Sequence, residues 1–334
     1  MKGVKLADIA RKTGYSVNTV SHALHNKPDI SEKTKQYIKS VADEMGYIAN
    51  VSAGALRSGK SKTIAIIVGD ISNPHFSIMI KEMEARLRKY GYSAFILNTD
   101  ENEELEKAAI ISAISKNVDG IIMCPVQRTR NNIDFINKIG LPYVLFGRRF
   151  EGNHSNYVIC DDVNGGYVAA EHLIDMGHKK ILFITGPEYI SGSRDRVEGA
   201  RRAAAVCGAD GVDLVIAETA LTENDGQILK ALRDNDECTG IICFSDMVAL
   251  KVCYYLEKFD KSVPDDKSVV GFDNIASKFC LPLMLTSVTS SKTKMSNKAV
   301  ETLMEIINKK SDGNYQYVLP TKIIERDSTK KISD

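Results

Sequence analysis

The chain has 334 residues, of which 43% are hydrophobic and 26% are charged, and its formal net charge is +1. This length accommodates a small domain plus one or two larger domains with a sizeable buried core. The charge is unevenly distributed. Residues 1–62 contain eleven Lys and Arg against five Asp and Glu, a net of +6, so the remainder carries −5. A basic segment followed by an acidic body favours a polyanion-binding module joined to a different kind of domain.

The cysteines and the N-terminus indicate the compartment. Seven cysteines, an odd number, lie among apolar neighbours without a C-x-x-C pair, which is typical of reduced core thiols. The opening residues MKGVKLADIA lack the apolar segment of a secretory signal, and no stretch approaches the roughly 18 apolar residues of a membrane span. We therefore expect a cytoplasmic protein without a membrane partner.

Three helical patterns fill the first fifty residues. The first helix ends at Gly14, Ser16 caps the second, and Ser31 caps a third that closes at Gly46. Their apolar positions recur at helical spacing: Leu6, Ile9 and Ala10, then Val17, Val20, Ala23 and Leu24, then Ile38, Val41, Ala42 and Met45. The segment predicts a compact three-helix domain.

From Thr63 onward, short apolar runs alternate with amphipathic stretches. Continuous β-branched runs separated by helices predict parallel sheets covered on both faces, and thus an α/β body of two doubly wound lobes with a ligand cleft at the carboxyl ends of the strands. The eight candidate strands are 64–68, 94–98, 120–124, 143–146, 181–185, 214–217, 240–244 and 268–271.

The motifs of common enzymes and cofactor sites do not occur in the sequence. The first strand of the body is followed by Gly69-Asp70-Ile71-Ser72-Asn73-Pro74, which is not a dinucleotide-binding G-x-G-x-x-G. There is also no Walker-type loop, no G-x-S-x-G elbow, no H-E-x-x-H, and no metal-ligand spacing among the six histidines. We expect no catalytic residues, no metal and no cofactor.

The N-terminal domain has the properties of a helix-turn-helix. Small residues in its first helix allow a close crossing, and Val17, Asn18, Ser21 and His22 project from the second helix, where short polar groups read the major groove. Spacing alone is equally compatible with a three-helix bundle of no special purpose. The basic charge of the segment favours DNA binding.

The run from Val4 to Asn50 resembles the DNA-binding head of the lactose-repressor (LacI/GalR) family without a gap, from Asp8-Ile9-Ala10 to Gly46-Tyr47-Ile48-Ala49-Asn50. The resemblance implies that Val17, Asn18 and His22 face base edges. It further implies that the phosphates are contacted by Ser16, Thr19, Ser21 and Asn26. The family usually has Arg where this chain has His22, and an imidazole cannot read guanine bidentately as a guanidinium does. This departure predicts a half-site that differs from the one that an arginine at this position would select.

The segment that follows, residues 50–62, resembles the hinge of the same family. Gly54 weakens any short helix there by about 0.5–1 kcal/mol relative to Ala. The resemblance implies that the hinge folds on DNA and wedges Leu56 between base steps in the minor groove. The alternative is a plain linker with an incidental leucine.

Residues 63–327 resemble the periplasmic-binding-protein-like core of the family. The resemblance rests on an ordered series of weak motifs: Asn73-Pro74-His75-Phe76, Asp161-Asp162-Val163-Asn164-Gly165-Gly166, Gly177-His178-Lys179-Lys180-Ile181, Arg196-Val197-Glu198-Gly199, Ser245-Asp246-Met247-Val248-Ala249, Gly271-Phe272-Asp273-Asn274 and Leu285-Thr286-Ser287-Val288. It implies a sugar-like effector held by Arg196 and Asp273 against the ring of Phe76. His75, Arg148, Asp161, Ser193 and Ser245 are further candidates.

Taken together, the resemblance implies a homodimeric repressor whose affinity for a palindromic DNA operator is controlled by a small effector. The expected domains are the helix-turn-helix at 1–49, the hinge at 50–62, one lobe at 63–161 and 290–319, and a second lobe at 162–289 and 320–330. Three crossovers are expected near 161, 290 and 320. A corepressor, such as a nucleobase or a partner protein, remains an alternative to an inducer. A secreted sugar-binding protein and a cytosolic sugar-modifying enzyme remain as other classes.

Overall fold

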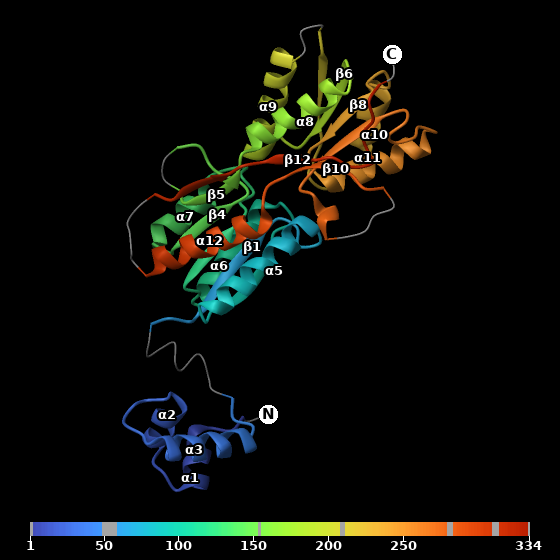
Figure 1. The fold of residues 1–334 in the computed structure, drawn as a ribbon. Coiled ribbons are helices and arrows are strands. Elements are labelled where there is room, and N and C mark those ends of the chain that lie inside the picture. Colours follow the sequence, from blue (N-terminus) through green and yellow to red (C-terminus); the bar gives the residue numbers. More distant parts are fainter. Residues whose placement is uncertain are drawn as a thin grey trace. The chain divides into compact units, whose positions relative to one another are not determined.

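The computed structural model describes residues 3–48, 59–152, 155–207, 211–278, 283–308 and 314–332. The chain divides into two units, Met1–Ser61, here called the head, and Lys62–Asp334, called the body. Figure 1 draws the elements of both units. Most of the predicted hinge, including Leu56, lies outside the described residues.

The head contains three helices, as predicted: α1 (Leu6–Thr13), α2 (Val17–Leu24) and α3 (Glu32–Glu44). The hydroxyls of Ser16 and Ser31 accept the backbone N–H of the third residue beyond them and so cap α2 and α3. Gly14 ends α1 at φ +76°, a left-handed conformation that glycine adopts without strain. The core is formed by Ile9, Ala10, Val20, Ala23, Ile38, Val41 and Ala42.

The first lobe of the body is a six-stranded sheet in the order β11-β5-β4-β3-β1-β2. Each neighbouring pair in this sheet is parallel. Its strands are β1 (Thr63–Val68), β2 (Ser93–Asn98), β3 (Gly120–Met123), β4 (Tyr143–Phe146), β5 (Tyr157–Cys160) and β11 (Gln316–Leu319). Its helices are α5 (Pro74–Lys89), α6 (Glu103–Ser115), α7 (Asn131–Ile139) and α12 (Lys292–Ile307). Figure 1 shows α5 and α12 lying along this sheet.

The second lobe repeats this architecture with the order β12-β10-β9-β8-β6-β7, and only the pair of β10 with β12 is antiparallel. Its strands are β6 (Lys180–Thr185), β7 (Asp213–Glu218), β8 (Gly240–Cys243), β9 (Ser268–Phe272), β10 (Thr286–Thr289) and β12 (Lys322–Ile324). Its helices are α8 (Asp162–Asp175), α9 (Ser191–Cys207), α10 (Asp225–Asp234), α11 (Asp246–Lys258) and the short 3-10 helix η1 (Ile275–Ser277).

Both faces of each sheet are buried, which explains the continuous apolar runs. In β1, Ile64, Ile66 and Val68 pack with residues of α5 and α12, whereas Ala65 and Ile67 pack with residues of α6 and α7 on the other face. Side chains alternate across a strand, so a strand covered on both sides is apolar at every position. The predicted α/β class with two doubly wound lobes is confirmed.

All eight predicted strands occur, and the structure adds β5, β10, β11 and β12. These four strands are three or four residues long. In β10, the hydroxyl residues Thr286 and Ser287 are fully buried. Short strands that bury hydroxyl groups lack the apolar run by which sequence reasoning finds strands.

The chain passes between the lobes where β5 leads into α8, where β10 leads into α12, and where β11 leads into β12. Two of these passages are bonded to each other. The backbone N–H of Asp161 donates to the carbonyl of Leu319 at 2.8 Å, and the Thr321 hydroxyl donates to the carbonyl of Asp161 at 3.0 Å. Two of the three connections between the lobes are therefore held together by hydrogen bonds.

Helices α8 and α9 cross so closely that glycine is required at the contact. A Cβ atom at Gly199 would lie 1.8 Å from the carbonyl oxygen of Val163, and one at Gly166 would lie 1.8 Å from that of Arg196. Neither backbone oxygen can move without separating the helices. The close crossing fixes the start of α9 against the start of α8.

We expect Gly199→Ala to lower the free energy of unfolding of the body by at least about 2 kcal/mol, because the added methyl group overpacks the crossing. Urea denaturation of the full chain measures this loss. Gly226→Ala in α10 is the matched control, because a Cβ there meets nothing within 4 Å. This control should be neutral or stabilising by up to about 1 kcal/mol. Equal stabilities of the two variants would contradict the packing argument.

Candidate functional site

The N-terminal end of α2 presents polar side chains on the surface of the head. Ser16, Val17 and Asn18 are exposed, and Thr19 is partly exposed. The hydroxyls of Ser16 and Thr19 lie 2.8 Å apart, so the two side chains hold each other in place. Because the backbone N–H groups and these hydroxyls gather at a helix N-terminus, this surface favours negatively charged groups such as phosphates.

The remaining predicted residues of the head differ in exposure. His22 is partly exposed and contacts Asp29, whereas Asn26 is exposed and accepts a hydrogen bond from Lys39 at 2.6 Å. Ser21 is only 6% exposed, which leaves little of it available to a ligand. The structure therefore brings Ser16, Val17, Asn18, Thr19 and His22 onto one accessible helix.

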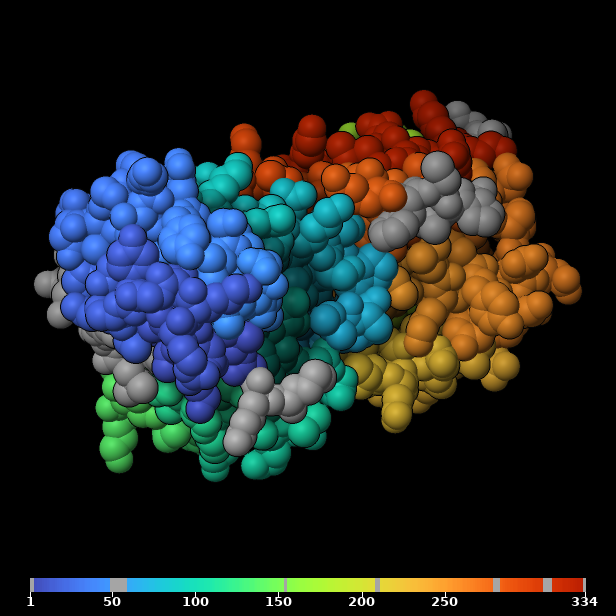
Figure 2. Space-filling view, turned by 90° about the horizontal axis from the view of Figure 1, so that it is seen from below, coloured from blue at the N-terminus to red at the C-terminus, as the bar shows by residue number. Residues whose placement is uncertain are grey.

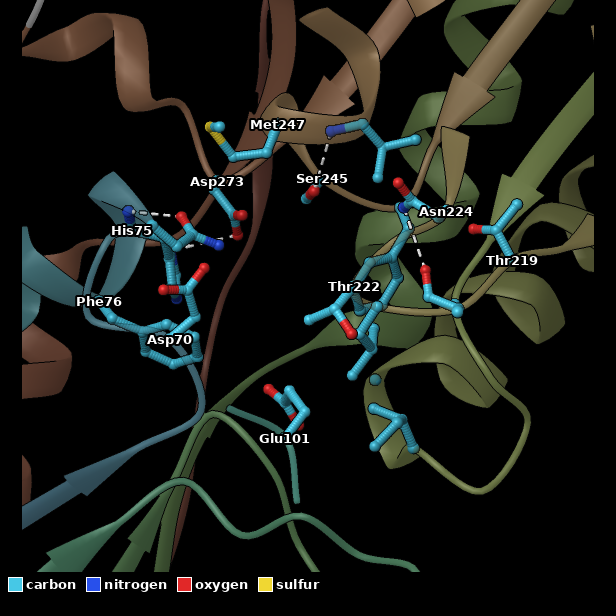
Figure 3. Close-up of a pocket in the computed structure, with 18 of the residues that line it drawn as sticks. Asp70, His75, Phe76, Glu101, Thr219, Thr222, Asn224, Ser245, Met247 and Asp273 are labelled. Atoms are coloured by element: carbon cyan, nitrogen blue, oxygen red, sulfur yellow. Dashed lines mark hydrogen bonds and ion pairs between the residues drawn. The ribbon is translucent and has the colours of Figure 1, made fainter. Parts of the chain in front are cut away.

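The body contains a cavity of about 350 Å³ lined by both lobes. Its lining residues follow the carboxyl ends of β1 to β4 in the first lobe and of β6 to β9 in the second lobe, the place where α/β folds bind ligands. Figure 3 shows residues of the two lobes facing each other across it, and in Figure 2 the cyan atoms of α5 border the orange atoms of the second lobe. Six of the eight predicted effector residues line it: His75, Phe76, Arg148, Arg196, Ser245 and Asp273.

Arg196 is a cation of the cavity that the surrounding residues hold in place. Its Nε donates to Asp162 at 2.7 Å and its Nη1 to the carbonyl of Phe244 at 2.5 Å. Its guanidinium carbon lies 3.8 Å from the centre of the Phe272 ring. Burial raises the pKa of Asp162, and the charge of Arg196 opposes that shift. The pair fixes the orientation of the guanidinium before a ligand arrives.

Arg148 is held in the same way in the first lobe. Its Nη1 and Nη2 donate to the two carboxylate oxygens of Glu101 at 2.7 and 2.8 Å, a bidentate pair, and Nη1 also donates to the carbonyl of Pro125. A Cβ at Gly69 would lie 2.0 Å from Glu101 Oε1, so a glycine admits the carboxylate. Asp100 and Glu101 both adopt positive φ, +48° and +55°, which is backbone strain of the kind that gathers at functional sites.

His75 and Asp273 come from different lobes and meet at the cavity. His75 Nδ1 lies 3.2 Å from Asp273 Oδ1, although without hydrogen-bond geometry. Burial lowers the pKa of His75 to about 4, against the opposing effect of Asp273. The imidazole is therefore neutral near pH 7, and the contact does not neutralise the charge of Asp273.

The two other predicted effector residues do not line this cavity. The carboxylate of Asp161 accepts from the backbone N–H of Asn164 and caps α8. Ser193 is 1% exposed, and its hydroxyl has no hydrogen-bond partner among the described residues. Ser245 lines the cavity, yet its hydroxyl is engaged in capping α11.

Several residues that the structure brings to the site were not among the site residues selected from the sequence. They are the partners Glu101 and Asp162 and the loop Thr219–Asn224 after β7. Another set joins the lobes directly: Gln127 Oε1 accepts from the backbone N–H of Ser191 at 3.0 Å, and Arg149 lies 2.5 Å from Asp195. The sequence signal for these residues is that they follow a predicted strand or begin a predicted helix, which are positions near the expected cleft.

Comparisons with known proteins also distinguish the head from the body. Residues 5–50 match the family "Bacterial regulatory proteins, lacI family", and residues 170–329 match the "Periplasmic binding protein-like domain". The transcriptional repressor PurR of Glaesserella parasuis is 30% identical over 328 residues, which cover 96% of this chain and 94% of PurR. The chain is therefore a DNA-binding transcriptional regulator, and it belongs to the lacI family. A sugar-modifying enzyme is not supported.

Two solved structures are similar in fold. The lac repressor dimer bound to operator and an anti-inducer has a TM-score of 0.84 and 20% identity, covering 98% of this chain and 100% of that chain. A periplasmic binding protein/LacI transcriptional regulator from Alkaliphilus metalliredigens, complexed with D-xylulofuranose, has a TM-score of 0.71 and 29% identity. The match covers 81% of this chain and 100% of that chain.

The described residues contain neither a candidate membrane span nor a candidate metal-binding cluster. None of their helices has the length and apolar character needed to cross a membrane. In the same residues, no group of three or more His, Cys, Asp or Glu side chains is arranged to hold a metal ion.

The carboxyl group of Asp246, between the cavity residues Ser245 and Met247, makes the stability of the body depend on pH. It is fully buried, Ser287 and the backbone N–H of Ile275 donate to it at 2.6 and 2.7 Å, and burial, followed by the charge of Asp273, raises its pKa to about 7. The folded state binds this proton more tightly than the unfolded state. Its contribution to stability is therefore complete below about pH 4 and is lost as pH rises to about 7.

We expect Asp246→Asn to gain stability relative to the natural protein as pH rises from 4 through 7, by on the order of 3 kcal/mol, and the difference to level off above about pH 8. Urea titrations at several pH values measure it. Asp234→Asn, an exposed carboxylate on α10, is the control and should run parallel to the natural protein. A difference for Asp246→Asn that does not change with pH would disprove the proton linkage.

Proposed function

We propose that this protein is a dimeric repressor that binds a palindromic operator and responds to a sugar or sugar derivative held between the lobes of its body. The observation that carries the proposal is the combination, in one chain, of an accessible helix-turn-helix with a cavity at which the strand ends of two lobes meet. A lacI-family head supplies the DNA reader, and the cavity supplies the sensor.

In the head, α2 enters the major groove. Val17, Asn18 and His22 face the base edges, while Ser16, Thr19 and Asn26 contact phosphates. Ser21 contributes from its partly covered position. Leu56, which lies outside the described residues, is proposed as a minor-groove wedge within a hinge at 50–62. Two heads related by dimer symmetry bind two half-sites, which makes the operator a palindrome.

In the body, Arg196 and Asp273 bind neighbouring hydroxyls of the effector, and Phe76 packs against an apolar face of the ring. His75, Arg148 and Ser245 line the same cavity and are further candidates for the effector, whereas Asp161 and Ser193 are candidates outside its lining. A bound sugar in the similar Alkaliphilus metalliredigens regulator supports a sugar as the ligand class. A nucleobase or protein corepressor is the second candidate.

The effector acts by shifting a population of lobe arrangements. Gln127 with Ser191 and Arg149 with Asp195 bridge the lobes, and a ligand that bonds to both lobes favours the arrangement in which its contacts are complete. The lobes are assigned to 63–161 with 290–319 and to 162–289 with 320–330, behind a head at 1–49. The regulator works in the cytoplasm, where bacterial DNA is accessible.

Operator selection from a random palindromic library, followed by release across a panel of sugars, tests the proposal. We expect one selected half-site and at least one sugar that changes the measured affinity. Binding of random and palindromic duplexes with equal affinity would disprove the proposal.

We expect Asp273→Asn to raise the sugar concentration needed for operator release at least tenfold, because a charged acceptor for sugar hydroxyls is lost. Operator affinity without sugar should stay within about twofold of the natural protein. Asp260→Asn is the matched control, because both residues have positive φ, +95° and +54°, and Asp260 is exposed outside the cavity. The same loss in both variants would rule out a direct contact. Fluorescence anisotropy with labelled operator measures both quantities.

The charges of the cavity predict that the effector is not an anion. Each of its cations already has a carboxylate partner within 2.8 Å: Arg148 has Glu101, Arg196 has Asp162, and Lys251 has Asp225. Asp70, Glu223 and Asp273 also line the cavity, while His75 is neutral. For any sugar that binds, we expect its phosphate ester to bind at least tenfold more weakly in calorimetric titrations. Tighter binding of the ester would contradict this charge balance.

A further inference from the structure

The recognition helix contains a histidine whose ring is held by a carboxylate. Nδ1 of His22, on α2, lies 2.5 Å from Oδ2 of Asp29, in the segment between α2 and α3. The hydrogen bond from His22 lowers the pKa of Asp29, so this side chain is an ionised carboxylate at neutral pH. A carboxylate only accepts hydrogen bonds, and therefore Nδ1 of His22 carries the proton and donates it.

Fixing the proton on Nδ1 determines the chemistry of the other ring nitrogen. In a neutral imidazole one nitrogen donates and the other accepts, so Nε2 of His22 is an acceptor. The side chain of His22 is 32% exposed, and its Nδ1 edge is occupied by Asp29. Nε2 is then the polar atom of His22 that remains to meet a ligand.

Several other polar groups around α2 have contacts of their own. Nδ1 of the neighbouring His25 lies 2.7 Å from the carbonyl of Ser21, and Lys39 of α3 donates to Asn26. On α1, Lys12 pairs with Glu44. Lys27 follows α2 and acts on Asp29 through its charge. Among the described residues, Asp29 is therefore the group that sets the hydrogen-bonding direction of His22.

We propose that His22 selects its base by accepting a hydrogen bond from an exocyclic amino group, adenine N6 or cytosine N4, and that Asp29 is the positioning residue that fixes this role. The inference rests on the proposed function, in which α2 lies in the major groove. There the only donors that base edges present are these two amino groups, whereas guanine N7 and O6 and thymine O4 accept. An arginine at this position donates only and reads guanine, so His22 inverts the polarity of the contact.

The experiment uses the full-length protein at pH 8, where an imidazole ordinarily carries a single proton. Operators are first selected by the natural protein and by His22→Ala, and the position whose preference disappears in His22→Ala is the base read by His22. The amino group of that base is then deleted, with purine in place of adenine or 2-pyrimidinone in place of cytosine. A second set of operators carries 7-deazapurines at the same base pair, which removes N7 acceptors.

We expect deletion of the amino group to weaken binding of the natural protein about three- to tenfold, the value of one hydrogen bond. The same deletion should have no effect on His22→Ala, and the 7-deaza substitutions should leave the natural protein's affinity unchanged. A loss caused by 7-deazaguanine, or none caused by deleting the amino group, would overturn the proposal.

Asp29→Ala tests the positioning role, because it frees the ring to carry its proton on either nitrogen. We expect it to relax the base preference at the His22 position alone, and Asp29→Glu to restore the preference. Asp43→Ala, which removes an exposed charge of the same sign from α3, is the control for a general gain in DNA affinity. An unchanged base profile in Asp29→Ala would refute the role of Asp29. Failure to select any half-site would instead refute the proposed function.

Discussion

The sensor site depends on the ion pair between the buried guanidinium of Arg196 and the carboxylate of Asp162. A buried cation costs several kcal/mol unless it is paired and hydrogen-bonded. Asp162 at the start of α8, the carbonyl of Phe244 after β8 and the ring of Phe272 at the end of β9 together meet this requirement. Each of these groups comes from a different element, so the pairing of one side chain fixes the positions of all of them.

The close crossing of α8 and α9 follows from the same requirement. Asp162 reaches Arg196 because the two helices approach at Gly166 and Gly199, where no side chain fits. Removal of either glycine would therefore alter both the packing of the lobe and the direction of the guanidinium. Stability and ligand recognition share the same residues here, which leaves little freedom to change one without the other.

Sequence reasoning was most successful where a single physical signal dominated. The three helices of the head carry caps and apolar spacing, and the eight predicted strands contain runs of apolar residues that pack into the cores of the lobes, so both were predicted. The strands β10 and β12 were missed because they are short, because β10 buries the hydroxyl residues Thr286 and Ser287, and because the two strands pair antiparallel although they are distant in sequence. Local periodicity in the sequence does not show with which distant strand a segment pairs.

The same limit applies to the cavity. Arg196 and Asp273 were selected through motifs, but their partners were not, since Glu101 reaches Arg148 only after two residues with positive φ and beside a glycine. For His22, sequence reasoning noted only that it replaces the arginine that is usual in the family. Its polarity depends on Asp29, seven residues further on, and that contact became visible only in the structure.

The order of strands in the two sheets has a consequence for synthesis of the chain. The first sheet is completed by β11 and the second by β12, and these strands are Gln316–Leu319 and Lys322–Ile324. Neither lobe has all its strands until Ile324 has left the ribosome, whereas the described core of the head is formed by residues 9–42 and can fold first. A nascent chain of this regulator therefore presents a finished DNA-reading domain while the sensor that controls it is still incomplete.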